Sequence, residues 1–317
     1  MVEKEDLRII FMGTPEFAVA SLDILVKNNY NIVGVVTATD KPAGRGNKLQ
    51  TSAVKQYAEA NQLKVLQPEK LKSPEFIEQL KALKPNLFVV VAFRMLPEIV
   101  WDMPQFGTFN LHASLLPQYR GAAPINWALI NGEKETGVTT FFLQHEIDTG
   151  NIIFQDKIQI TEQDNVGSVH DKLMQIGAEL VLKTVQAVEK NEVQSYAQIS
   201  NLQSSNLILQ HAPKIFKETC LINWNNSAEN VQNLIRGLSP YPAAFTYLDN
   251  KTLKIYSSII NEERNLIDTS IGNFYTDGKT FLSFRAADTF IDILELQLEG
   301  KKKMTVQEFL RGHRFNL

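Results

Sequence analysis

The chain has 317 residues, a length that fits two domains of ordinary size better than one. Hydrophobic residues make up 44% and charged residues 21%, and the formal net charge is -3, which excludes a disordered chain and a chain-wide basic surface for nucleic acid. A single cysteine, Cys220, excludes an internal disulfide, and the lack of a signal core or a long apolar run predicts a cytoplasmic protein outside the membrane.

The first half of the chain alternates strand-like and helix-like segments. Short runs that are mostly apolar and predict buried strands lie at residues 7–12, 32–37, 87–92, 109–111 and 138–143. Thr14, Pro15 and Glu16 predict a helix start with Thr14 as its cap, and apolar residues recur at helical spacing over 68–83. Buried strands separated by helices are typical of an α/β fold with a doubly wound, mostly parallel, Rossmann-like sheet.

The pattern changes after residue 150. Residues 152–160 indicate an antiparallel strand, and 166–188 indicate a long helix that closes the domain. A stretch rich in Ser, Asn and Gln at 194–213 is typical of a linker. We therefore expect a first domain over 1–193 and a second over 214–317.

The second domain contains short β-like runs separated by turn signals such as Asp249-Asn250 and Asp277-Gly278. The runs are 246–248, 253–257, 280–284 and 291–296. Short strands at this spacing, interrupted by one helix at 228–238, predict a small C-terminal β-barrel of the OB type.

The densest group of chemically capable residues begins at Asn110. Asn110 and His112 are two positions apart, so at the end of a strand both side chains leave the same face, where α/β sheets bind ligands. Asp148 follows another predicted strand, so an amide, an imidazole and a carboxylate can converge. Taken singly, a strand-end histidine is more often structural, and Asp before Thr-Gly is more often a turn residue. These residues alone leave the reaction open.

The order of the motifs is more specific. Asn-Leu-His-Ala-Ser-Leu-Leu-Pro at 110–117, Tyr-Arg-Gly-Ala-Ala-Pro at 119–124 and Asp-Thr-Gly at 148–150 together resemble the folate-dependent formyltransferase superfamily. The resemblance implies a formyltransferase domain at 1–193 that binds 10-formyltetrahydrofolate as the formyl donor. It implies that Asn110, His112 and Asp148 are the catalytic residues. The three residues do not choose among acceptors.

The same resemblance implies a set of folate contacts. They are Phe93, Arg94, Leu96, Ser114, Leu115, Leu116 and Pro117. Many members carry Tyr-Gly where this chain has Phe93-Arg94. The segment is still expected to line the pterin pocket mainly through backbone groups. The difference from the Tyr-Gly of other members leaves open where the Arg94 guanidinium points.

Further segments are similar to the branch of the superfamily that acts on methionyl initiator tRNA. They are Gly-Thr-Pro-Glu-Phe at 13–17, the loop at 40–49, and the C-terminal segments 222–224, 233–244 and 297–304. This resemblance covers nearly the whole chain. It implies a monomer that makes N-formylmethionyl-tRNA for translation initiation, with the C-terminal barrel binding the tRNA.

Contacts to tRNA are expected from local basic clusters, because the overall charge is slightly negative. The candidates are Lys41, Arg45 and Lys48 in the loop, and Lys301, Lys302 and Lys303 near the C-terminus. A solvated loop and a solvated turn remain the alternative interpretations of these two clusters.

No metal is expected, because the five histidines form no zinc-like spacing with Cys or carboxylates. No Gly-x-Gly-x-x-Gly pattern follows the first strand, so a nicotinamide cofactor is not expected either. Two alternatives stay open: the amine of a sugar nucleotide as acceptor, and a non-catalytic RNA- or folate-binding module. The division of proton transfer between His112 and Asp148 is open too.

Overall fold

The computed structural model describes residues 3–43, 48–198, 208–266 and 269–315. The chain forms two compact units. Unit 1 comprises residues 1–121, 137–158 and 170–211, and unit 2 comprises 122–136, 159–169 and 212–317. The boundaries expected at 193 and 214 stay predictions, and residues 199–207 of the expected linker lie outside the described residues. In the described parts of the chain, no helix has the length and apolar character needed to cross a membrane.

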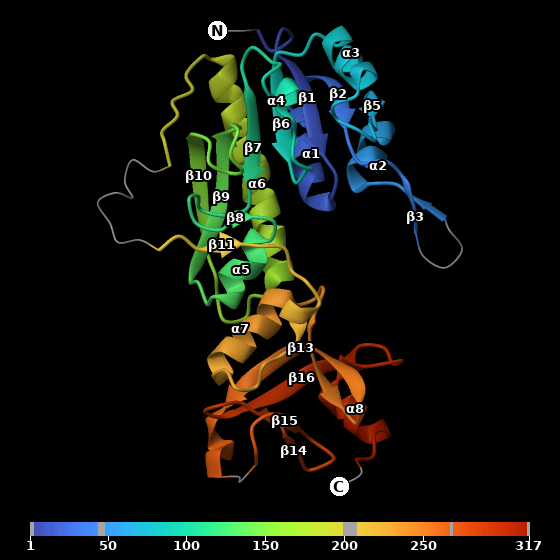
Figure 1. The fold of residues 1–317 in the computed structure, drawn as a ribbon, viewed down its shortest axis with the longest axis vertical. Coiled ribbons are helices and arrows are strands. Elements are labelled where there is room, and N and C mark those ends of the chain that lie inside the picture. The colour runs from blue at the N-terminus through green and yellow to red at the C-terminus, as the bar shows by residue number, and fades with distance from the viewer. Residues whose placement is uncertain (1–2, 44–47, 199–207, 267–268, 316–317) are drawn as a thin grey trace. The chain divides into compact units, whose positions relative to one another are not determined.

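Unit 1 is built on a seven-stranded sheet in the order β10-β9-β7-β6-β1-β2-β5, whose strands lie side by side in Figure 1. The strands are β1 (Arg8–Gly13), β2 (Asn31–Val36), β5 (Val65–Leu66), β6 (Leu87–Val91), β7 (Thr108–His112), β9 (Glu135–Phe142) and β10 (Ile152–Gln159). The run from β7 through β6, β1 and β2 to β5 is parallel, and β9 is antiparallel to β7. The predicted mostly parallel α/β sheet is therefore confirmed.

Helices connect these strands. They are α1 (Glu16–Lys27), α2 (Ala53–Ala60), α3 (Pro74–Ala82), α4 (Glu98–Trp101), α5 (Pro124–Ile130) and α6 (Val166–Glu189). Short strands complete the set: β3 (Lys41–Ala43), β4 (Lys48–Gln50), β8 (Arg120–Gly121) and β11 (His211–Ala212).

Two details of the helix prediction are wrong. The N-cap of α1 is Pro15, which makes no side-chain cap hydrogen bond, so Thr14 does not cap the helix. The apolar pattern over 68–83 is helical only from Pro74, because Ser73 caps α3 and proline disfavours a helical conformation in the residue before it.

Unit 2 contains a curled antiparallel half-barrel in the order β12-β13-β16-β15-β14, with β17 beside β16. The strands are β12 (Ala244–Leu248), β13 (Lys251–Asn261), β14 (Phe274–Thr276), β15 (Leu282–Arg285), β16 (Phe290–Leu298) and β17 (Met304–Thr305). Its helices include α7 (Ala228–Leu238) and α8 (Val306–Gly312), and the 122–136 segment adds α5. Asp249 and Asn250 both have positive φ, +51° and +60°, as a tight two-residue hairpin requires. The predicted barrel-like domain and its helix are thus confirmed.

A half-buried polar cluster lies on one side of the half-barrel around Asp292. The Asp292 carboxylate accepts hydrogen bonds from Arg264 Nε at 3.0 Å, from Asn261 Nδ2 at 2.8 Å and from the Ser283 hydroxyl. Burial by itself raises the pKa of Asp292, but the hydrogen bonds from Arg264, Ser283 and Asn261 outweigh it and lower the pKa below its ordinary value.

Asp292→Asn should therefore destabilise unit 2 by roughly 1.5–3 kcal/mol at neutral pH, since it replaces a charged acceptor. The folded-state pKa is depressed, so the charge stabilises the fold above the unfolded pKa, about 3.9, and that contribution is lost as pH falls through the folded value. Calorimetric unfolding should show a large stability difference between Asp292→Asn and wild type at pH 7, and a smaller difference near pH 3. Glu218→Gln, at an exposed carboxylate, is the control, and an equal effect of the two substitutions would contradict the prediction.

Candidate active site

Strand β7 sets the direction of the first two candidate side chains. Gly177 of α6 approaches it so closely that an added Cβ would lie 2.8 Å from Leu111 Cδ2, so Leu111 faces the helix. Because side chains alternate along a strand, Asn110 and His112 lie on the opposite face. The Asn110 side chain is half-buried and, within the part of the chain that the structure describes, forms no hydrogen bond. Its amide is available to a ligand.

Protein groups face both nitrogens of the His112 ring, which is 7% exposed. Nε2 lies 2.9 Å from the carbonyl oxygen of Tyr119, and Nδ1 lies 3.9 Å from Asp148 Oδ2. A carbonyl can only accept, so Nε2 carries a proton in this arrangement. The distance to Asp148 exceeds that of a direct hydrogen bond. Either a protonated Nδ1 faces the carboxylate as an ion pair, or a water can bridge the two groups.

Asp148 lies in the turn that follows β9. Its φ of +56° is left-handed, a conformation that Asp tolerates better than most residues. The Gly121 N–H donates to Asp148 Oδ2 at 3.0 Å and so fixes the carboxylate beside His112. The structure thus brings His112 and Asp148 together, with Asn110 on the same face of the sheet as His112.

A fourth side chain, Gln198, joins the loops that carry these groups. Its amide donates to the carbonyl oxygens of Asp148 and Gly150 at 2.9 and 2.8 Å. Its own oxygen accepts from Arg120 Nε at 3.1 Å and Nη2 at 2.6 Å. Burial lowers the pKa of Arg120, and the charges of Asp148 and Glu146 oppose that shift. Sequence reasoning missed Gln198, because it lies in a stretch whose composition is typical of a linker.

The Phe93-Arg94 segment is folded back onto unit 1. The Arg94 guanidinium donates to the carbonyl oxygens of Glu69, at 3.0 Å, and Pro68. Phe93 packs against a buried cluster that includes Leu96. The direction of the Arg94 side chain is therefore set by backbone carbonyls.

The segment after β7 uses several of its own polar groups internally. The buried Ser114 hydroxyl donates to the Gln118 carbonyl at 2.7 Å, and Leu116 packs with Phe141. Leu115 and Pro117 are half-buried. The side chains of Ser114 and Leu116 consequently face the protein interior, so a ligand here would meet mainly backbone groups and the two half-buried side chains.

The first basic cluster lies on a short hairpin. Strands β3 and β4 pair antiparallel, with Lys41 opposite Gln50, and Lys41 is exposed. Arg45 and the side chain of Lys48 lie outside the described residues. Near the base of the hairpin, Asp40 pairs with Lys55 Nζ at 2.5 Å, so the hairpin is fixed to α2.

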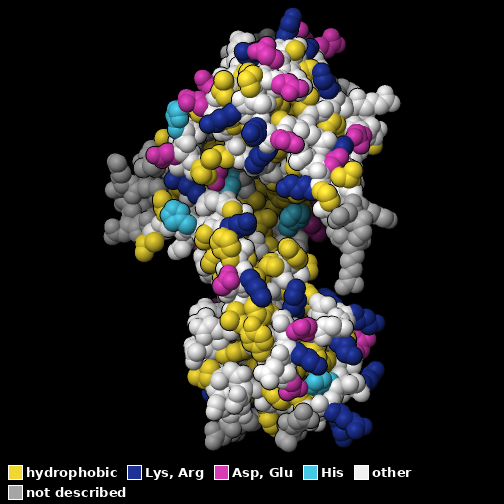
Figure 2. Space-filling model, turned by 45° about the vertical axis from the view of Figure 1, so that its right-hand side comes forward, with side chains coloured by type: hydrophobic (Ala, Val, Ile, Leu, Met, Phe, Trp, Pro, Cys, Tyr) yellow, Lys and Arg dark blue, Asp and Glu magenta, His cyan; other side chains and the backbone are white. Residues whose placement is uncertain are grey.

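The second basic cluster is in unit 2. Lys301, Lys302 and Lys303 are all exposed, but Lys303 Nζ lies 2.7 Å from Glu295 Oε2. Figure 2 shows Lys and Arg side chains along one side of the C-terminal part of the chain, with acidic side chains among them. The positive charge is local, as the net charge predicts.

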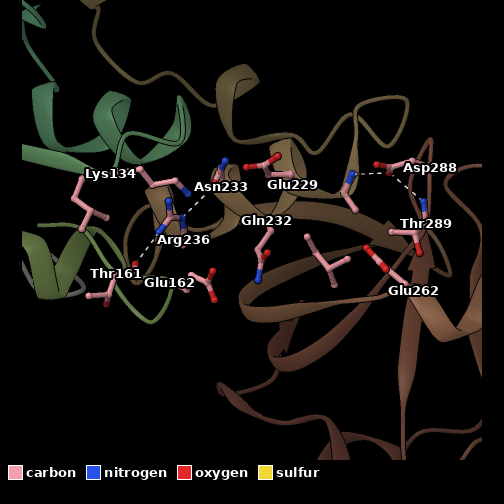
Figure 3. Close-up of a pocket in the computed structure, with 13 residues that line it drawn as sticks. Lys134, Thr161, Glu162, Glu229, Gln232, Asn233, Arg236, Glu262, Asp288 and Thr289 are labelled. Carbon is pink, nitrogen blue, oxygen red and sulfur yellow. Dashed lines mark hydrogen bonds between the residues drawn. The ribbon is translucent and has the colours of Figure 1, made fainter.

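A polar pocket of about 600 Å³ lies within unit 2 (Figure 3). Arg236 projects toward one end of it and donates to Asn233 Oδ1 at 2.9 Å and to the Thr161 carbonyl at 3.0 Å. The lining includes the carboxylates of Glu162, Glu229 and Asp288. None of the candidate catalytic, folate or tRNA residues lines it. The hydrogen bond from Arg236 to the Thr161 carbonyl connects α7 to the 159–169 segment.

Comparison with known families accounts for both halves of the chain. The "Formyl transferase" family model matches residues 7–185, and the "Formyl transferase, C-terminal domain" model matches residues 214–314. A methionyl-tRNA formyltransferase of Bacteroides fragilis is 56% identical over 98% of this chain and 96% of its own. One of Flavobacterium johnsoniae is 52% identical over 98% of each chain.

Solved structures give the same fold. A sugar 3N-formyl transferase, crystallised with dTDP and 5-N-formyl-THF, aligns with a TM-score of 0.65 over 93% of this chain and 99% of its own. Its sequence is 23% identical, so this similarity supports the fold and not the acceptor.

The turn that carries Asp148 should not tolerate a side chain at Gly150. A Cβ there would lie 1.6 Å from the Phe142 carbonyl oxygen, so Gly150→Ala must displace the backbone. We expect a loss of roughly 1–3 kcal/mol or more in stability and faster amide hydrogen exchange over 145–151. Gly312→Ala, where an added Cβ meets nothing within 4 Å, is the control. Unchanged stability and exchange for Gly150→Ala would refute this account of the turn.

Proposed function

Because the chain belongs to the methionyl-tRNA formyltransferase family, we propose that it transfers the formyl group of 10-formyltetrahydrofolate to the α-amino group of methionyl initiator tRNA. The product is N-formylmethionyl-tRNA, used in translation initiation. The observation that carries this proposal is that 56% identity to a methionyl-tRNA formyltransferase extends over 98% of the chain. The similarity therefore extends over both regions that the family models match, residues 7–185 and 214–314.

Asn110 is proposed to stabilise the negative charge of the reaction. Attack of the α-amine on the formyl carbon gives a tetrahedral intermediate with charge on the former carbonyl oxygen. The Asn110 amide supports this role, because it is half-buried and uncommitted among the described residues. Loss of one such donor commonly costs on the order of 100- to 1000-fold in rate.

His112 and Asp148 are proposed to carry out the proton transfers of the reaction. The attacking amine loses a proton, and N10 of the folate gains one as it leaves. The 3.9 Å between His112 Nδ1 and Asp148 Oδ2 suits either a charged imidazole held by the carboxylate or a relay through one water. The half-buried Leu115, Pro117 and Phe93 support a folate site beside these residues, as proposed from the family resemblance.

The remaining proposals concern the acceptor. The β3-β4 hairpin with Lys41, Arg45 and Lys48, and the triplet Lys301–Lys303, are proposed to contact tRNA phosphates. We also propose that the protein acts as a cytoplasmic monomer, with residues 1–193 as the catalytic domain and 214–317 as the tRNA-binding domain.

The first test is transfer of labelled formyl from 10-formyltetrahydrofolate to methionyl initiator tRNA. Wild-type protein should catalyse it, and Asp148→Ala should reduce kcat on the order of 100- to 10,000-fold, since general acid–base support is lost. Asp171→Ala, an exposed carboxylate on α6, is the matched control. Absence of transfer by the wild type, with transfer to an amino sugar nucleotide, would replace this function by the sugar alternative. Tight folate binding with no turnover on either acceptor would favour a non-catalytic module.

A second test addresses the basic hairpin. Arg45→Ala should raise KM for tRNA without changing KM for the folate, because a phosphate contact is lost. The slope of log kcat/KM against log salt should become shallower by about 0.7–0.9 for each contact removed. Lys190→Ala, an exposed cation after α6, should leave both quantities unchanged. Identical salt slopes for wild type and Arg45→Ala would remove the hairpin from tRNA binding.

A further inference from the structure

The side chain of Gln198 is unusual because it is almost fully enclosed and all of its hydrogen-bonding groups are used. It is 6% exposed, and it makes four hydrogen bonds, two through its amide nitrogen and two through its oxygen. Its partners belong to two separate loops. Those loops carry Arg120 on one side and Asp148 with Gly150 on the other.

These are the two loops whose separation sets the position of the Asp148 carboxylate. Gly121 follows Arg120 directly, and the Gly121 N–H is the donor to Asp148 Oδ2. Gln198 therefore binds the backbone of Asp148, whose carboxylate accepts this hydrogen bond, and the side chain of Arg120, which directly precedes the donor Gly121. A displacement of either loop would change the 3.9 Å between Asp148 Oδ2 and His112 Nδ1.

The segment that carries Gln198 is itself anchored to the same turn. Tyr196 and Ile152 form a reciprocal pair of backbone hydrogen bonds, at 2.9 and 3.0 Å. Residue 152 is two positions beyond Gly150, so an isolated antiparallel bridge anchors the backbone two residues before Gln198 close to the turn that the Gln198 side chain contacts. The left-handed φ of Asp148 makes this support consequential, because the turn departs from the backbone conformation that most residues prefer.

We propose that Gln198 is a positioning residue for formyl transfer, acting through Asp148: its buried carboxamide fixes the turn at 148–150 against the Arg120-Gly121 loop and so holds the Asp148 carboxylate beside His112. This inference rests on the proposed function and adds to it a residue outside the catalytic motifs. Gln198 has no contact with the reacting atoms in this account.

Two substitutions separate the parts of the contact. Gln198→Met keeps the approximate size and removes all four hydrogen bonds. Gln198→Glu keeps an acceptor for Arg120 but removes both donors to the Asp148 and Gly150 carbonyls, and places negative charge against them. If the turn contacts matter, both variants should lower kcat by about 10- to 100-fold, the effect expected of a small misplacement of a reacting group. KM for folate and for tRNA should stay within about twofold.

The decisive comparison is a double-mutant cycle with Asp148→Ala, measured as kcat for transfer to methionyl initiator tRNA. If Gln198 acts through Asp148, Gln198→Met should have little further effect in the Asp148→Ala background. The pH dependence of kcat should shift in Gln198→Met and stay at wild type in Gln159→Met, a control at an exposed glutamine. If the role of Gln198 were merely structural, Gln198→Met would lower the melting temperature, and its effect on kcat would multiply with that of Asp148→Ala. That result would overturn the proposal.

The outcomes also separate this inference from the function on which it rests. Loss of activity in Asp148→Ala together with wild-type kcat in both Gln198 variants would overturn the positioning role alone. Full activity of Asp148→Ala would overturn the proposed active site instead. If Gln198→Met fails to fold, Gln198→Glu carries the same comparison, since it retains the hydrogen bonds from Arg120.

Discussion

The arrangement of the candidate active site depends on one hydrogen bond between two loops, from the Gly121 N–H to Asp148 Oδ2 at 3.0 Å. This bond joins the loop that follows β7 to the turn that follows β9, and it places a carboxylate beside the imidazole of His112. The left-handed φ of Asp148 determines the direction in which its carboxylate leaves the backbone. Groups that hold the two loops together, such as Gln198, therefore control the geometry of the site.

In the site, contacts with the protein orient His112 and Asp148, whereas the Asn110 amide is left available to a ligand. His112 has a carbonyl at one nitrogen and a carboxylate near the other, so its ring is oriented before any substrate arrives. Asn110 lies on the same face of the sheet, and its amide forms no hydrogen bond with the described residues. Preorganised donors of this kind stabilise developing charge without reorganising during the reaction. The arrangement suits an acyl transfer between a neutral amine and a folate nitrogen.

Local sequence patterns predicted the elements of the fold well where burial dominates. The run that became β6 is apolar over its whole length, and β1 is apolar from Ile9 to Met12, as expected of strands buried on both faces of the sheet. The predicted elements were wrong where one residue decides a boundary. Thr14 has the chemistry of a cap, yet Pro15 occupies that position. The apolar pattern over 68–83 starts before the helix, because spacing cannot show that the helix begins only at Pro74.

By itself the sequence determined the two kinds of architecture, mostly parallel α/β and antiparallel half-barrel, and it singled out Asn110, His112 and Asp148 through motifs at the ends of strands. Such signals are local, since burial periodicity and turn chemistry act over a few residues. Only the tertiary structure decided how the residues around them are used. Gln198 lies 50 positions from Asp148 and 78 from Arg120, and its role follows from hydrogen bonds that exist only after the chain has folded.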